Sequence, residues 1–160
     1  MSNNFSKNKV VVITGGAKKI GRATAKKLAD QGFNILIHTG GKSIDEAKKT
    51  VAIVKEYGVQ SDFIDGDLAD IKTIDKIKGA AEKLGTPSVL INNAGLRIHD
   101  DFEKITYEDW KRVMTVNVDA SFLCTQALIG HMTKQKWGRA ITIGGLSAHI
   151  GAQESAHVVT

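Results

Sequence analysis

The sequence has one cysteine and one proline, and it lacks both a long hydrophobic run and a signal-peptide core. A single cysteine cannot form a disulfide within the chain, and we expect Cys124, inside an apolar helical pattern, to be a small buried hydrophobic residue. No apolar run approaches the ~20 residues of a membrane-spanning helix, so we predict no membrane association. The N-terminal stretch MSNNFSKNK favours a cytoplasmic location. We predict no metal site.

The remaining composition is that of a globular protein. A chain of 160 residues with 42% hydrophobic and 24% charged residues can bury a core, and we expect one domain over residues 9–160 after a flexible start at 1–8. The net charge of +5 raises the question of nucleic-acid binding. The lysines, however, are scattered over polar helix faces without aromatic residues among them. We therefore predict no nucleic-acid partner, and we assign part of the basic excess to the phosphates of a cofactor.

Short apolar runs alternate with amphipathic stretches along the chain. The runs predict strands over residues 10–14, 33–38, 60–65, 88–92 and 139–144. The stretches between them predict helices from Gly21 to Gly32, over 44–54 and 71–84, and a longer one over 107–135. Such alternation predicts an α/β fold with a doubly wound parallel sheet in the order 3-2-1-4-5. We expect the less apolar third strand at an edge, and Pro87 in the connection before the fourth.

A glycine-rich turn follows the first strand. Gly15 and Gly16 break the apolar run, and Gly21 opens a helix. We expect the apolar stripe of this helix to include Ile20, Ala23 and Leu28. A strand, a glycine turn and a helix N-terminus form a cradle for an anion, usually a pyrophosphate. Gly15 would provide the tight turn and Gly21 the close packing of helix on strand, although a purely structural loop is the alternative.

The segment after the second strand is the place where dinucleotide folds distinguish their cofactors. An acidic residue there binds the ribose 2′-hydroxyl, whereas a basic residue accepts a 2′-phosphate. Residues 38–43 read HTGGKS, with no carboxylate before Asp45. Lys42 and Ser43 can both donate hydrogen bonds to a phosphate, and Lys18 of the glycine turn lies on the same side. We therefore predict NADP(H), with NAD(H) less favoured; the alternative is that both lysines are merely exposed.

The tetrapeptide NNAG, residues 92–95, follows the fourth strand. Its asparagine amides can bridge neighbouring strand ends, and Ala94-Gly95 allows a flat ring or a ribose to approach the backbone. With the TGGAKKIG turn and Asp67, this motif resembles the short-chain dehydrogenase/reductase family, over residues 9–160. The family's glycine turn reads TGxxxGxG; Lys19 replaces its middle glycine, as a basic residue does in pteridine-reductase-like members.

The resemblance implies a Rossmann fold and a nicotinamide cofactor. An aspartate that precedes a helix is first of all an N-cap, and the family's match to Asp67 also contacts the adenine ring. The expected cofactor-binding residues are Thr14, Gly15, Lys18, Lys19, Ile20, Gly21, Thr39, Lys42, Ser43, Asp67, Leu68, Asn93, Ala94 and Gly95.

The implied chemistry is hydride transfer between the nicotinamide and a carbonyl or hydroxyl substrate. The family uses a tyrosine as acid/base, a lysine four residues later, a serine at the end of the fifth strand and an asparagine. Asn117 matches the asparagine, which the resemblance implies holds a proton-relay water; the alternative is an asparagine that distorts the helix and bonds to backbone. Gly145 stands in place of the serine, and Ser147 would substitute only if the loop bulges.

The tyrosine position falls near residues 157–158, where His157 and Val158 stand. Histidine can do acid/base work near neutral pH, but we expect His157 to be an inert residue on a helix surface. The lysine would lie beyond Thr160. The alternative function is therefore a non-catalytic dinucleotide-binding or interaction protein, instead of an oxidoreductase resembling reductases of ketone, 3-oxoacyl or pteridine-type substrates.

The family's sheet has a further strand beside the fifth, and Thr160 falls within what should become the next helix. We expect either that the sequence is a fragment or truncated product, cut off after the fifth strand, or that a partner completes the fold, because an open apolar edge invites pairing. Family members pair through the helix equivalent to 107–135, which implies a homo-oligomer.

Overall fold

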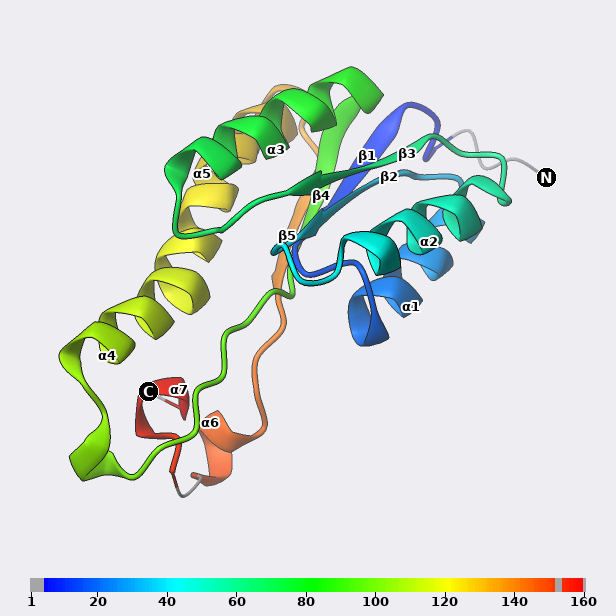
Figure 1. The fold of residues 1–160 in the computed structure, drawn as a ribbon. Helices are drawn as coiled ribbons and strands as arrows, with labels where there is room; N and C mark the ends of the chain where they lie inside the picture. The colour runs from blue at the N-terminus through cyan, green and yellow to red at the C-terminus, as the bar shows by residue number, and fades with distance from the viewer. Residues whose placement is uncertain (1–4, 152–153, 160) are drawn as a thin grey trace.

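The computed structural model describes residues 5–151 and 154–159, and its core is one parallel sheet (Figure 1). The strand order is β3-β2-β1-β4-β5, which confirms the doubly wound prediction and places β3 and β5 at the edges. The strands are β1 (Lys9–Ile13), β2 (Asn34–Thr39), β3 (Ser61–Asp65), β4 (Thr86–Asn92) and β5 (Arg139–Thr142). The order reverses between β1 and β4, so the ends of these two strands define the expected ligand site.

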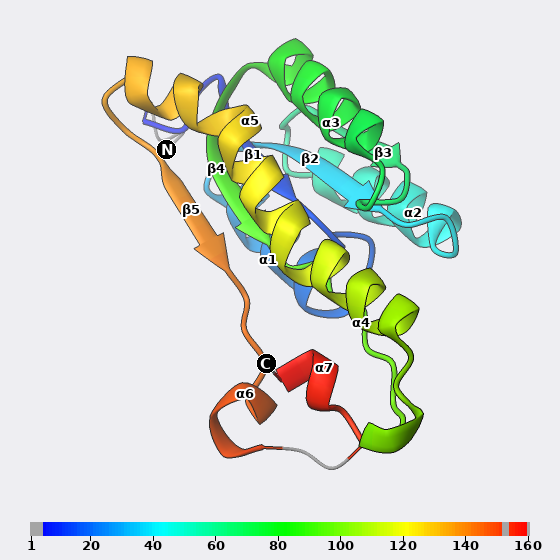
Figure 2. The same ribbon diagram turned by 90° about the vertical axis from the view of Figure 1, so that its left-hand side faces the viewer.

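Helices cover both faces of the sheet. One face carries α1 (Lys19–Asp30) and α2 (Ile44–Lys55), and the other carries α3 (Ile71–Leu84) and α5 (Ala120–Lys134) (Figure 2). The predicted long helix consists of α4 (Tyr107–Met114), a π-helical segment (Thr115–Asp119) and α5, after a short 3-10 turn (Phe102–Lys104). Two short helices, α6 (Ser147–Ile150) and α7 (Ala156–Val159), lie beyond the carboxyl edge of the sheet, with α7 against α4.

Strict alternation along β1 divides the core into two layers. Val10 and Val12 pack with residues of α3 and α5, whereas Val11 and Ile13 pack with residues of α1 and α2. All four side chains are fully buried, because a central parallel strand is covered on both faces. Cys124 of α5 lies in the first layer, as predicted, and burial raises the pKa of its thiol to about 11.

Two local predictions about the fold are wrong. The buried stripe of α1 consists of Gly21, Ala25 and Ala29, whereas Ile20 is 60% exposed. Ala23 is exposed too, whereas Leu28 is half-buried and packs against the core as predicted. Small residues spaced four apart let the helix approach the sheet closely. Pro87 lies within β4 instead of before it. The register of β4 against β1 shifts at this point, and a proline without an N–H is tolerated at such an irregularity.

The edge strand β5 and the long helix expose apolar surface. Every residue of β5 is exposed, and β5 is the last strand of the described sheet. Among the described residues, one helical stretch, Tyr107–Lys134, is long and apolar enough to cross a membrane by length and composition alone. Its buried residues, including Cys124 and Leu128, pack against the sheet in the layer shared with α3.

Candidate cofactor site

The ends of β1 and β4 are tied together by side chains of the two predicted motifs. The Thr14 hydroxyl accepts hydrogen bonds from the N–H groups of Asn93 and Ala94, each at 3.0 Å. In return, the Asn93 amide donates to the carbonyls of Thr14 and Gly15, both at 3.0 Å. The expectation that the NNAG amides bridge neighbouring strand ends is therefore confirmed, and the first glycine turn is fixed to the NNAG segment.

The glycine turn has the geometry expected of an anion cradle. Gly15 has a φ of +62°, which permits the tight turn. A Cβ on Gly21 would lie 2.5 Å from the Gly15 carbonyl oxygen, so only glycine allows this approach. Lys19 has a φ of +50°, and it therefore adopts the left-handed backbone that a glycine would adopt without strain at the same position.

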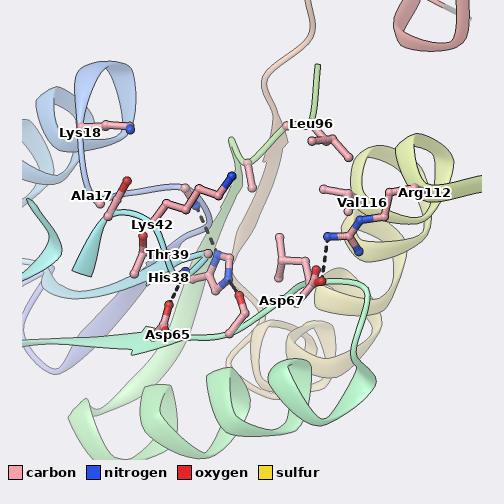
Figure 3. A pocket seen from close by; sticks show the side chains of 18 residues that line it. Ala17, Lys18, His38, Thr39, Lys42, Asp65, Asp67, Leu96, Arg112 and Val116 are labelled. Carbon is pink, nitrogen blue, oxygen red and sulfur yellow. Dashed lines mark hydrogen bonds and ion pairs between the residues drawn. The ribbon is translucent and has the colours of Figure 1, made fainter. Parts of the chain in front are cut away.

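A pocket of about 650 Å³ opens over the carboxyl ends of the strands (Figure 3). Many predicted cofactor-binding residues line it: Gly15, Lys18, Thr39, Lys42, Ser43, Asp67, Leu68, Ala94 and Gly95. Others stand outside the lining. Thr14, Gly21 and Asn93 form the framework behind it, whereas the side chains of Lys19 and Ile20 are exposed at the start of α1.

The two predicted phosphate-binding lysines lie at one side of this pocket. Lys18, from the glycine turn, and Lys42, from the β2–α2 loop, are both exposed and face the same opening (Figure 3). The loop itself contains no carboxylate before Asp45, but one approaches the lysines from a neighbouring strand. Asp65, the last residue of β3, also lines the pocket, and its carboxylate accepts a hydrogen bond of 2.5 Å from the Gly41 N–H. The sheet brings this acid beside the loop from a different strand.

A buried histidine forms part of the pocket wall. His38 of β2 is 3% exposed, its Nδ1 lies 3.4 Å from the Gly15 N, and its Nε2 lies 2.9 Å from the Gly66 carbonyl oxygen. Burial lowers the pKa of His38, although the Gly66 carbonyl and the carboxylates of Asp65 and Asp67 act in the opposite direction. This residue therefore favours the neutral form.

Asp67 forms an ion pair across the mouth of the pocket. Its carboxylate lies 2.7 Å from the Arg112 guanidinium of α4 and accepts from the Ala69 N–H at 3.0 Å. Partial burial would raise the pKa of Asp67, but the Ala69 N–H and the charge of Arg112 hold this pKa below its usual value. The N-cap of α3 is Asp70, not Asp67, since the Asp70 side chain accepts from the Lys72 N–H.

Asn117 lies in the π-helical segment, and both ends of its amide are bonded to backbone. Its Oδ1 accepts from the Leu96 N–H at 2.8 Å, and its Nδ2 donates to the Leu96 carbonyl at 3.1 Å. The arrangement corresponds to the alternative interpretation, in which an asparagine distorts the helix and bonds to backbone. It attaches the loop after β4 to the long helix.

The remaining predicted catalytic residues lie apart from the pocket. Ser147 begins α6 and does not line the pocket. His157 in α7 is 2% exposed, so the expected position on a helix surface is wrong. The helix α7 packs against α4. Both ring nitrogens of His157 lack a hydrogen-bond partner among the described residues. The described residues also contain no cluster of three His, Cys, Asp or Glu side chains able to hold a metal.

Among the pocket-lining residues that sequence reasoning missed, three carry titratable or charged side chains: His38, Asp65 and Arg112. The first two end predicted strands, and the carboxyl ends of parallel strands face the ligand site, so their positions alone were a usable signal. Arg112 had none, because its contribution depends on how the start of the long helix lies over the sheet.

Comparison with known proteins agrees with this geometry. The profile of the family described as short chain dehydrogenase matches residues 9–157. The chain therefore belongs to the short-chain dehydrogenase family, a class of oxidoreductases built on the Rossmann fold.

Several relatives cover nearly the whole chain. L-rhamnose 1-dehydrogenase (NADP(+)) of Thermoplasma acidophilum is 35% identical over 96% of this chain and 61% of its own length. The 3-oxoacyl-(acyl-carrier-protein) reductase FabG of Aquifex aeolicus is 33% identical, over 89% of this chain and 58% of its own length. The crystal structure of acetoin dehydrogenase YohF from Salmonella typhimurium superposes with a TM-score of 0.89 at 31% identity, covering 95% of this chain and 60% of that one. The chain thus spans about three fifths of the length of these relatives.

Proposed function

We propose that this protein binds NADP(H) and belongs to an oxidoreductase that transfers hydride between the nicotinamide and a small carbonyl or alcohol substrate. The observation that carries the proposal is the pairing of Lys18 and Lys42 at one side of the pocket that the glycine turn and the NNAG segment frame. Two cations lining the same side of one pocket favour a 2′-phosphate over a bare ribose hydroxyl. The printed name of the T. acidophilum relative, which specifies NADP(+), is consistent with this choice.

Different residues of the pocket would contact different parts of the cofactor. The turn from Gly15 to Gly21 would hold the pyrophosphate at the N-terminus of α1, where the helix dipole favours negative charge. Lys18, Lys42 and Ser43 would hold the 2′-phosphate. Asp67 and Leu68 would lie against the adenine, and Ala94-Gly95 would accept the flat ring or ribose beyond it. When bound, the cofactor supplies the hydride; the chain supplies its placement.

The proposed substrate class rests on the relatives, and the residues expected to donate a proton are not conserved in type in this chain. The relatives' names cover a sugar, a 3-oxoacyl-(acyl-carrier-protein) and acetoin, so we propose a carbonyl or alcohol substrate. Gly145 and Val158, however, stand where the serine and tyrosine are expected, and neither side chain can transfer a proton. This observation supports the second candidate, a dinucleotide-binding protein without turnover, for the 160-residue chain.

The proposal also covers the cellular location and the oligomeric state of the protein. We propose a cytoplasmic protein without nucleic-acid or membrane partners, which forms a homo-oligomer through the helix 107–135. Exposed apolar residues on this helix support pairing, among them Val118, Phe122 and Ile129. Size-exclusion chromatography with light scattering tests the assembly, and a monomer at all concentrations would refute it.

The deciding experiment is calorimetric titration of the protein with NADP⁺ and with NAD⁺. We expect NADP⁺ to bind at least tenfold more tightly, with a micromolar or lower Kd. Equal affinities would refute the cofactor preference, and no binding of either dinucleotide at millimolar concentration would refute the proposed function. Turnover of ketone, sugar and hydroxyketone substrates with the bound cofactor then distinguishes the oxidoreductase from the non-catalytic candidate.

A further inference from the structure

The imidazole of His38 connects three segments that arrive at the pocket from different strands. Its Nδ1 faces the N–H of Gly15, the first residue of the glycine turn, at 3.4 Å. Its Nε2 lies 2.9 Å from the carbonyl oxygen of Gly66, in the segment after β3. The backbone carbonyl of His38 also accepts from the Gly16 N–H at 3.0 Å. One residue of β2 thus contacts the turn after β1 and the segment after β3.

These partners determine the protonation state of the ring. A backbone N–H can only donate, so Nδ1 must present its lone pair to Gly15. A carbonyl oxygen can only accept, so Nε2 must carry the proton that it donates to Gly66. Only the neutral Nε2–H tautomer satisfies both contacts. A proton on Nδ1 would set two donors against each other in a site that is almost closed to water.

Charged groups around the ring act in both directions. The carboxylates of Asp65 and Asp67 favour the charged ring, but each is already engaged, with the Gly41 N–H and with Arg112 respectively. Lys18 and Lys42 line the same pocket and disfavour a further positive charge. Burial is the largest influence, and it lowers the pKa of His38. The electrostatics therefore agree with the hydrogen-bond geometry.

We propose that His38 is a positioning residue of the cofactor site, which keeps the glycine turn in its binding shape only while the imidazole is neutral. The inference rests on the proposed function, since it assumes that the turn from Gly15 to Gly21 holds a dinucleotide. Protonation of His38 removes the acceptor that faces the Gly15 N–H and places a positive N–H against it. The turn then moves away, and the binding-competent state becomes a minor population.

The pH dependence of NADP⁺ affinity tests this role, because the competent fraction falls about tenfold for each pH unit below the pKa of His38. The 2′-phosphate itself titrates near pH 6, so the wild-type profile alone is not decisive. His38→Asn provides the matched control: its Oδ1 can take the place of Nδ1 as an acceptor, and it does not titrate. His38→Gln retains a donor that can reach Gly66 but places no acceptor at the Nδ1 position.

We expect His38→Asn to bind NADP⁺ within about threefold of the wild type at pH 8, and His38→Gln to bind at least tenfold more weakly. As the pH falls through the lowered pKa of His38, wild-type affinity should decline more steeply than that of His38→Asn, with the difference approaching about tenfold per pH unit. Parallel profiles of the wild type and His38→Asn would overturn the role of His38 and leave the proposed function intact. Absence of NADP⁺ binding to the wild type at every pH would instead overturn both.

A second measurement needs neither a variant nor a bound cofactor. Long-range ¹H–¹⁵N correlation spectra of the histidine rings, assigned by sequential connectivity, report the tautomer directly. We expect the Nε2–H form for His38 at pH 7, with a titration midpoint below that of an exposed histidine. An Nδ1–H tautomer or a charged ring at pH 7 would overturn the inference even if the variants fail to fold.

Discussion

The side-chain amide of Asn117 and the backbone of Leu96 form a reciprocal pair of hydrogen bonds. The Leu96 N–H donates to Oδ1 at 2.8 Å, and Nδ2 donates to the Leu96 carbonyl at 3.1 Å. The pair attaches the loop that follows the NNAG segment to the π-helical part of the long helix. Since Leu96 lines the pocket, Asn117 positions one of its walls.

Asn117→Ala should therefore lower the free energy of unfolding by about 1–3 kcal/mol, because the N–H and carbonyl of Leu96 lose their partners. Asn117→Asp keeps the acceptor for the N–H but sets a carboxylate oxygen against the Leu96 carbonyl oxygen, so we expect it to destabilise the protein as well. Urea denaturation followed by circular dichroism measures both. If Asn117→Ala unfolds like the wild type while NADP⁺-dependent turnover disappears, the residue acts on the substrate side and not on the loop.

Lys42 should control the preference for a phosphorylated cofactor. Lys42→Ala removes a charged donor to the 2′-phosphate, and we expect NADP⁺ affinity to fall about tenfold to a hundredfold, the equivalent of about 1.5–3 kcal/mol. NAD⁺ affinity should stay unchanged, as should both affinities in Lys26→Ala, where the exposed lysine of α1 lies outside the pocket. Calorimetric titration measures all three proteins. An equal loss for NAD⁺ and NADP⁺ would place Lys42 at the pyrophosphate.

Asp65 makes two opposing contributions to the same loop. Its carboxylate holds the Gly41 N–H, which orders the loop that carries Lys42, but its charge repels a phosphate. Asp65→Asn keeps an acceptor for Gly41 and removes the charge, so NADP⁺ affinity should rise about two- to fivefold, a gain below about 1 kcal/mol at this exposed position. Asp65→Ala loses the contact with Gly41, and its NADP⁺ affinity should fall. Identical affinities for the two variants would show that the hydrogen bond to Gly41 is unimportant.

The lowered pKa of His38 also predicts how stability depends on pH. Between its ordinary value of 6.5 and the lower folded-state pKa, the unfolded chain binds a proton that the folded protein does not. The free energy of unfolding should therefore fall as the pH decreases through this window and level off below the folded-state pKa. Urea denaturation at several pH values measures the slope. Subtracting the profile of His38→Asn isolates the histidine, and a difference of zero would contradict the prediction.

The fold was predictable because the strands coincide with short apolar runs and the helices with a helical period of apolar residues. Val10–Ile13 reads as a buried strand, and the strand order followed from the alternation of elements. The orientation of α1 was not predictable in the same way. Its sequence contains two possible buried stripes, one that includes Ile20 and one made of Gly21, Ala25 and Ala29. The helix lies close to the sheet, so the stripe of small residues is buried, and this distance cannot be predicted from the sequence.

The cofactor site was predictable to the extent that it depends on local motifs. The glycine turn and NNAG are contiguous segments whose places at strand ends follow from the topology. Asp65 comes from another strand, and His157 is buried in α7, a short helix that packs against α4, so the surroundings of both residues depend on tertiary structure. Asn117 is an intermediate case. The sequence allowed the interpretation that its side chain bonds to backbone, but it did not identify Leu96 as the partner.

Gly21 and Gly79 provide a matched pair for testing the close contact of α1 with the glycine turn. A Cβ on Gly21 would lie 2.5 Å from the Gly15 carbonyl oxygen and 2.7 Å from the Gly16 Cα, whereas a Cβ on Gly79, inside α3, meets no atom within 4 Å. Gly21→Ala should therefore destabilise the protein by about 1–3 kcal/mol through overpacking and should weaken NADP⁺ binding by displacing the turn.

Gly79→Ala should instead stabilise the protein by about 0.5–1 kcal/mol, because alanine is the better helix former, and it should leave NADP⁺ affinity unchanged. Thermal denaturation and calorimetric titration of the two variants measure both effects. A Gly21→Ala protein as stable as the wild type and with unchanged NADP⁺ affinity would mean that the turn can move away from α1 without cost. Glycine at position 21 would then be needed neither for stability nor for NADP⁺ binding. Lys19, in its left-handed conformation, would be the next residue of the turn to test.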